Sequence, residues 1–188
     1  MRSAGPLGLL AVVVVLFAVA SGGGAARAAD DANALELAVK ATFLFKFQPF
    51  VTWPAEAFAS PAAPFTLCIV GNHPFGPLLD RVVEGQRALD RDVVVRRLAT
   101  VSPDDHCQVL YVGAADPVSA KQLQAPVAGA PVLTVTDSIG DSDAKGMINF
   151  VIADNRVRFE IDDAAARRSG LVISSKLLSL ALSVRSSP

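Results

Sequence analysis

Apolar residues beyond position 60 come in short runs bounded by turn residues, and several of these runs are rich in valine and isoleucine. A short apolar run between turn signals is typical of a buried β-strand. The pattern predicts strands at residues 66–70, 93–98, 107–112 and 132–135.

Helical spacing accounts for most of the remaining apolar positions. We expect a helix over residues 34–47, which Asp31 and Asn33 can cap, a second over residues 75–83 and a brief one around Leu123. Strands that alternate with helices predict an α/β fold, in which a single domain has a mostly parallel sheet flanked by helices. Residues 99–106 are too few for a helical crossover, so the local topology stays open there.

The last third of the chain predicts a C-terminal β-hairpin. Strands at residues 147–152 and 157–161 flank the turn 153–156, and apolar and charged residues alternate along the second strand. Asp162 or Asp163 is placed to cap a short helix that ends before Gly170. Residues 171–182 then form a last apolar element, which we expect to be a strand that turns into a helix.

The first 28 residues have the composition of a secretory signal peptide. Arg2 supplies the positive charge, residues 7–20 are almost wholly apolar, and residues 26–28 fit an A-x-A cleavage site. A retained membrane anchor is the alternative. Cleavage would leave residues 29–188 as a periplasmic domain that does not insert into the membrane.

Composition excludes several classes of protein. The chain has 188 residues, of which 52% are hydrophobic and 19% charged, with a formal net charge of −1. This much apolar surface argues against a disordered chain, and the charge balance argues against a nucleic-acid binder. The length fits one domain.

Residues that could carry catalysis are scarce. The sequence contains no G-x-S-x-G, H-E-x-x-H or P-loop motif, and His73 and His106 are its only histidines. We therefore expect no enzymatic activity, no cofactor and no metal.

Two segments are candidates for binding. In residues 71–76, Asn72, His73 and Gly76 lie between a strand and a helix start, where backbone N–H groups could hold an anion; a plain structural turn is the alternative. A second segment is rich in aromatic residues, which either pack in the core or form an apolar patch for a protein partner. Its members are Phe43, Phe45, Phe47, Phe50 and Trp53.

Export changes the interpretation of Cys68 and Cys107, the only two cysteines. A disulfide is the default in an oxidising compartment, and neighbouring strands could bring the two sulfurs together. Two buried free thiols are the alternative. A zinc site is disfavoured because the chain has neither Cys-x-x-Cys nor His-x-x-x-His spacing.

An ordered series of motifs resembles the YfiR family. It covers about residues 33–182 and consists of KATFLFKF (40–47), FVTWP (50–54), LCIVG (67–71), PFG (74–76), GMINF (146–150), RFEI (158–161), AR (166–167) and LVISSKLL (171–178). The sequence departs from the family pattern at Lys46 and at Gln48-Pro49, and it lacks the second cysteine pair of some members.

The resemblance implies a periplasmic regulatory protein. Such a protein binds the periplasmic sensor domain of an inner-membrane diguanylate cyclase and represses cyclic di-GMP synthesis. Cys68 and Cys107 match a cysteine pair of these repressors, which implies that their bond serves folding or sensing. The alternative is a periplasmic small-ligand binding module that serves another membrane sensor. A homodimer stays open.

Overall fold

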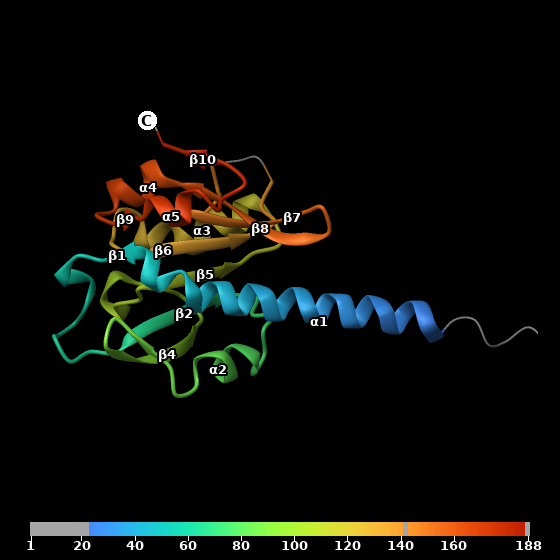
Figure 1. Cartoon of the computed structure of the whole chain (residues 1–188). Coiled ribbons are helices and arrows are strands. Elements are labelled where there is room, and N and C mark those ends of the chain that lie inside the picture. Colours follow the sequence, from blue (N-terminus) through green and yellow to red (C-terminus); the bar gives the residue numbers. More distant parts are fainter. Residues whose placement is uncertain (1–22, 141–142, 187–188) are drawn as a thin grey trace, which may run out of the picture. The chain divides into compact units, whose positions relative to one another are not determined.

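The computed structural model describes residues 23–140 and 143–186 (Figure 1). The chain divides into two units, residues 1–33 and residues 34–188. The described part of the first unit is the start of helix α1 (Gly23–Lys46), and every other described element belongs to the second unit. Most of the expected signal peptide, residues 1–22, lies outside the described residues.

An eight-stranded sheet organises the second unit. The strand order is β10-β8-β7-β6-β5-β2-β4-β3, and the strands from β4 to β7 in this order are mutually parallel. This confirms the α/β class with a mostly parallel sheet. The strands are β2 (Phe65–Gly71), β3 (Arg87–Ala88), β4 (Arg91–Leu98), β5 (Val109–Gly113), β6 (Leu133–Asp137), β7 (Ile148–Ala153), β8 (Arg156–Asp162) and β10 (Val184–Arg185).

Smaller elements complete the described fold. Strands β1 (Val51–Thr52) and β9 (Val172–Ile173) form a separate antiparallel pair. The α-helices after α1 are α2 (Leu78–Val83), α3 (Pro117–Gln124), α4 (Asp163–Arg168) and α5 (Ser175–Leu178). Four 3-10 turns are η1 (Gln48–Phe50), η2 (Ala55–Ala57), η3 (Pro103–Asp105) and η4 (Ala125–Val127).

Each face of the sheet has its own apolar cluster. Residues of α1, α2, α4 and α5 pack with Leu67, Tyr111 and Val135 on one face. On the other face, Val127 of η4 and the half-buried Leu123 of α3 pack with Val112. Because successive strand residues point to opposite faces, a strand buried on both sides is apolar throughout, which explains the unbroken run in β2.

The predicted C-terminal hairpin is confirmed. β7 and β8 pair antiparallel from Ile148↔Ile161 to Ala153↔Arg156. Asp154 and Asn155 form the turn with φ of 51° and 56°, the left-handed conformation that two-residue hairpin turns require. Asp162 caps α4 by accepting a hydrogen bond from the N–H of Ala165 at 2.8 Å.

Two predicted helix starts are wrong. α1 begins at Gly23, so Asp31 and Asn33 lie inside the helix and cap nothing; the alanine-rich sequence before them favours helix strongly enough to extend it. The second helix begins at Leu78 instead of residue 75, because Gly76 has a φ of 49°, a conformation outside the helical region.

The connection from β4 to β5 resolves the open topology. Both strands pair in parallel with β2, one on each side of it, so residues 99–108 cross β2 without an α-helix. Val101 and Cys107 of this crossover are buried in the same cluster as Val112. The connection that leaves β2 leads to β4 on one side, whereas the connection that leaves β5 leads to β6 on the other side, so the topological switch point lies between β2 and β5.

Candidate functional site

The loops that follow β2 and β5 touch at the switch point. The N–H of Asn72 donates to the carbonyl of Gly113 at 2.8 Å. A Cβ added at Gly113 would lie 1.6 Å from the carbonyl oxygen of Asn72, so only glycine fits there. The side chains of Asn72 and His73 are exposed, whereas Gly76 accepts a hydrogen bond from Arg97 at 2.7 Å. The N–H of Asn72 therefore donates within the chain and is not available to an anion. Anion binding by the rest of this loop stays a prediction.

The aromatic segment lies mostly in the core. Phe45, Phe47 and Trp53 are buried, as the core-packing alternative predicts, and their rings are not at the surface of the folded chain. The indole N–H of Trp53 donates to the carbonyl of Gln108 at 2.9 Å. Phe43 and Phe50 are half-buried. They are the two aromatic residues of this segment that keep exposed ring surface, so contact with a partner stays a prediction for these two.

Lys40 forms a buried ion pair that the sequence did not reveal. Its side chain is almost fully buried, and its ammonium lies 2.8 and 2.7 Å from the two carboxylate oxygens of Asp137 and 2.5 Å from Glu36. The hydroxyl of Tyr111 donates to Asp137 at 3.3 Å. Burial, with the charge of Asp137, raises the pKa of Tyr111. The cluster joins α1 to the carboxyl ends of the strands; the one signal for it in the sequence is a lysine within an apolar helix four residues after a glutamate.

The expected disulfide is present. Cys68 in β2 and Cys107 just before β5 are bonded, with their Cα atoms 5.8 Å apart. Both residues are buried. The bond therefore ties the end of the crossover between β4 and β5 to β2, the strand that the crossover passes.

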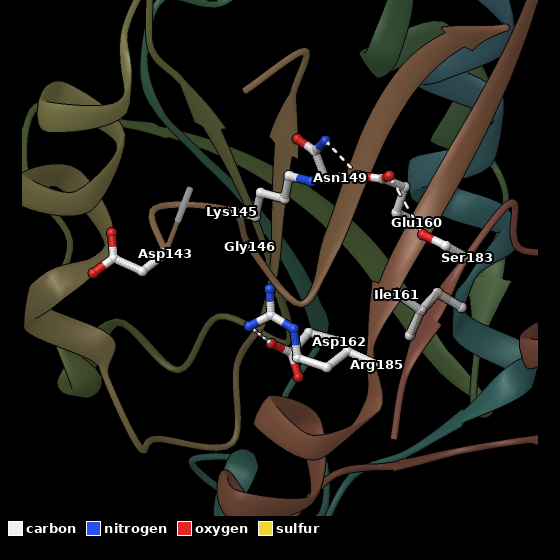
Figure 2. Close-up of a pocket in the computed structure, with 9 residues that line it drawn as sticks. All are labelled: Asp143, Lys145, Gly146, Asn149, Glu160, Ile161, Asp162, Ser183 and Arg185. Carbon is white, nitrogen blue, oxygen red and sulfur yellow. Dashed lines mark hydrogen bonds and ion pairs between the residues drawn. The ribbon is translucent and has the colours of Figure 1, made fainter. Parts of the chain in front are cut away.

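A polar pocket of about 210 Å³ opens beside β8 (Figure 2). Its two cations already have carboxylate partners. Lys145 lies 2.9 Å from Glu160, and Arg185 lies 3.2 Å from Asp162. The hydrogen bond from Lys145 holds the pKa of Glu160 below its ordinary value. The lining residues are Asp143, Lys145, Gly146, Asn149, Glu160, Ile161, Asp162, Ser183 and Arg185.

Metal-binding chemistry has no counterpart in residues 23–140 and 143–186. There, histidine, cysteine, aspartate and glutamate side chains form no group of three that could hold a metal ion. The sulfur of Cys107 is bonded to Cys68 and is therefore not a free thiolate ligand. The neighbouring His106 is the residue that ends η3, with a φ of 47°. The same part of the chain contains no helix with both the length and the hydrophobicity of a membrane span.

Exposed apolar side chains gather near the C-terminus. Of the nine large hydrophobic side chains that are exposed among the described residues, four lie within residues 172–184. They are Val172, Leu180, Leu182 and Val184, and we use the name C-terminal surface for these four side chains together with the exposed cations Arg168 and Lys176. Figure 1 shows β9, α4, α5 and β10 together, and α4 contacts both β9 and β10.

Charge distinguishes the C-terminal surface from the rest of the chain. Residues 163–188 contain four basic side chains and one acidic side chain, while the whole chain has a net charge of −1. That one acid, Asp163, is buried and accepts a hydrogen bond from Arg167 at 2.8 Å. An apolar surface with basic side chains is suited to a protein partner of complementary charge.

The fold is that of a disulfide-bonded α/β protein that exposes large apolar side chains near its C-terminus. The model of the YfiR/HmsC-like family matches residues 37–182. The chain therefore belongs to the YfiR/HmsC-like family, as its ordered motifs predict. Proteins of this family are periplasmic, regulatory rather than catalytic, and act in general on membrane sensors of the diguanylate cyclase type.

Proposed function

We propose that this protein is a periplasmic repressor that binds the periplasmic sensor domain of an inner-membrane diguanylate cyclase and lowers cyclic di-GMP synthesis. Membership of the YfiR/HmsC-like family supports the regulatory role. On this proposal residues 1–28 are a signal peptide that is removed on export, and residues 29–188 are the mature domain.

The observation that carries the binding role is the C-terminal surface. Val172 is 61% exposed and Leu180 is 53% exposed, although neither residue lies at a chain end. Apolar side chains kept at the surface are the anchors on which binding energy concentrates when a partner excludes water from them. The neighbouring Arg168 and Lys176 suit an acidic face on the sensor domain. Phe50 lies next to this surface, since the ammonium of Lys176 is 5.6 Å from its ring centre.

Cellular cyclic di-GMP tests the proposal. Deleting the gene in a strain that expresses the candidate cyclase should raise cyclic di-GMP and biofilm formation. Restoring the gene with Val172→Asp and Leu180→Asp should fail to lower them. The matched control is Val118→Asp, which changes an equally exposed valine on α3 and should restore repression. An unchanged cyclic di-GMP level in the deletion strain would contradict the proposal.

Binding to the purified sensor domain separates contact from folding. The two aspartate substitutions should weaken binding while the circular dichroism spectrum and the thermal midpoint stay unchanged, because both side chains are exposed. Equal binding by the variant and the Val118→Asp control would place the contact elsewhere on the chain.

The polar pocket supports a second candidate function, a small-ligand module for a membrane sensor. Its volume suits a small polar molecule, and Lys145 and Arg185 face it from opposite sides (Figure 2). Calorimetric titration with the ligands extracted from periplasm distinguishes the two roles. Ligand binding that Arg185→Ala abolishes, without any binding to the sensor domain, would favour the ligand module.

A further inference from the structure

The last described segment of the chain lies against β8 without burying a side chain. We call residues 179–186 the C-terminal strap, and each of its side chains is exposed or half-buried. The N–H of Leu182 donates to the carbonyl of Phe159 at 2.8 Å. The N–H of Ile161 donates to the carbonyl of Ser183 at 3.0 Å. Because a segment with few buried apolar contacts opens at a low free-energy cost, the strap has a docked and an open position in equilibrium.

Side chains of the polar pocket fasten the strap to β8. The hydroxyl of Ser183 donates to Glu160 at 3.3 Å, and the guanidinium of Arg185 lies 3.2 Å from the carboxylate of Asp162. Ser183 and Arg185 both line the pocket (Figure 2). Side chains alternate along an extended strand, so Val184, which lies between them, points away from the pocket. The strap therefore connects the pocket on one side to the C-terminal surface on the other.

The carboxylates that line the pocket beside the strap already have hydrogen-bond donors within the chain. Glu160 accepts from three side chains, those of Lys145, Asn149 and Ser183. One oxygen of Asp162 accepts from the N–H of Ala165 at 2.8 Å, and the other lies beside Arg185. Carboxylates with this many partners have little capacity left for donor groups of a ligand.

Arg185 has unused hydrogen-bond capacity. A guanidinium carries several N–H donors in a planar fork, and within the described residues the one ion-pair partner of Arg185 is Asp162. The Arg185 side chain is 58% exposed. An arginine fork binds a carboxylate through two parallel hydrogen bonds. The ammonium of Lys145 faces the same pocket and adds positive charge (Figure 2). The pocket is therefore suited to a ligand that supplies acceptor oxygens.

Charge and volume narrow the class of ligand. The ionic side chains around the pocket form three ion pairs, Lys145–Glu160, Arg185–Asp162 and Lys121–Asp143. Because these pairs balance, a singly charged ligand suits the site better than a doubly charged one. Drug-sized ligands occupy about 300–1,000 Å³, whereas this pocket has a volume of about 210 Å³. A monocarboxylate of a few carbon atoms fits both limits.

We propose that the pocket binds a small monocarboxylate through Arg185 and that the bound ligand holds the C-terminal strap in its docked position. The site exists only while the strap is docked, because Arg185 belongs to the strap and Glu160 and Asp162 belong to β8. Opening the strap therefore requires release of the ligand, and the ligand stabilises the docked position by mass action.

The consequence of this site for signalling rests on the proposed function. Leu182 and Val184 are members of the C-terminal surface, and the docked strap fixes their positions. The ligand should therefore strengthen binding to the sensor domain, and the sensor domain should strengthen ligand binding by the same factor. Ligand binding and strap opening are measured on the purified protein alone, so their failure and the failure of cyclase repression are separate results.

Amide hydrogen exchange followed by NMR tests the effect on the strap, with lactate as the probe. The N–H groups of Leu182 and Ile161 are bonded between strap and β8, so they exchange when the strap opens. Lactate at about ten times its dissociation constant should slow both exchange rates by about tenfold. The N–H of Leu133, which donates to Gln108 in the core, should keep its rate. Lactate binding that leaves the two rates unchanged would overturn the proposal.

A neutral ligand and a matched variant test the role of Arg185. Lactamide has the shape of lactate without its charge and should not slow the exchange. Arg185→Gln should weaken lactate binding by at least about tenfold, the loss expected for one charged hydrogen-bond partner. The control Arg156→Gln changes an exposed arginine on β8 and should leave lactate binding unchanged. Equal binding of lactamide, or equal losses in the two variants, would overturn the site.

Binding to the purified sensor domain tests the link to signalling. Lactate should strengthen the binding of the wild-type protein by about fivefold, at the low end of ordinary coupling between sites, and should not affect Arg185→Gln. Sensor binding that is the same with and without lactate would overturn the link to the C-terminal surface. If the sensor domain does not bind at all, the proposed function fails, while the exchange experiment still decides whether the ligand holds the strap.

Discussion

The ammonium of Lys40 and the carboxylate of Asp137 are joined by two short hydrogen bonds across 97 positions of sequence. Because Lys40 is almost fully buried, removing its charge leaves a carboxylate in a site with little solvent. Breaking one half of a buried ion pair costs about 3–5 kcal/mol. We expect Lys40→Met to lower the free energy of unfolding by that amount in urea denaturation.

Two controls identify the cause of that loss. Lys46→Met changes an exposed lysine on the same helix and should have little effect. Lys40→Met combined with Asp137→Leu removes both charges and should recover much of the lost stability. No recovery in the double variant would show that the lysine acts through its packing and not through its charge.

The contact between Gly113 and Asn72 gives a steric prediction. Gly113→Ala places a Cβ where the Asn72 carbonyl lies, so the loops after β5 and β2 must separate. We expect a loss of about 2 kcal/mol or more in unfolding free energy, in the range of severe point mutations. Gly140→Ala is the control, since nothing lies within 4 Å of its added Cβ. Equal unfolding free energies for Gly113→Ala and Gly140→Ala would contradict the close contact between Gly113 and the Asn72 carbonyl.

The disulfide should matter for stability. It links residues 39 positions apart, and the chain-entropy model gives a contribution of about 4 kcal/mol for a loop of this length. Replacing Cys68 and Cys107 by alanine should lower the thermal midpoint. Dithiothreitol should lower the midpoint of the wild-type protein but not that of the double variant. If dithiothreitol still lowered the thermal midpoint of the double variant, its effect would not be due to reduction of the Cys68–Cys107 bond.

Acid should weaken the fold through Glu160. The hydrogen bond from Lys145 holds the pKa of Glu160 below its ordinary value of 4.5. A carboxyl whose pKa is lower in the folded state contributes stability above its unfolded pKa, and this contribution is lost as the pH falls through the folded pKa. Unfolding free energy should therefore decline below about pH 5, and Glu160→Gln should flatten that decline. A decline as steep in the variant as in the wild-type protein would assign the effect to other carboxylates.

Sequence patterns anticipated the parts of the fold that depend on local chemistry. The hairpin follows from alternating residues around Asp154 and Asn155, and the cap at Asp162 follows from its place before an alanine-rich helix. Periodicity also located β2 and β4 to within about two residues, as expected of element boundaries.

The parts that sequence did not reveal depend on residues far apart in the chain. Nothing near Lys40 shows that Asp137 will neutralise it, because the two residues lie 97 positions apart and meet only through the tertiary fold. The same holds for the C-terminal surface, where Leu180 and Leu182 have the composition of core residues. The burial of Phe45 and Trp53 likewise follows from packing against the sheet, which periodicity alone does not specify.

The single disulfide also bears on how the chain matures. Cys68 is synthesised before its partner, so its thiol stays unpaired until Cys107 emerges 39 positions later. With only two cysteines, a single intramolecular pairing exists, and no wrong bridge within one chain has to be reshuffled. Oxidative folding of this domain therefore requires a thiol oxidant but no disulfide isomerase, and the competing side reaction is a bridge between two chains.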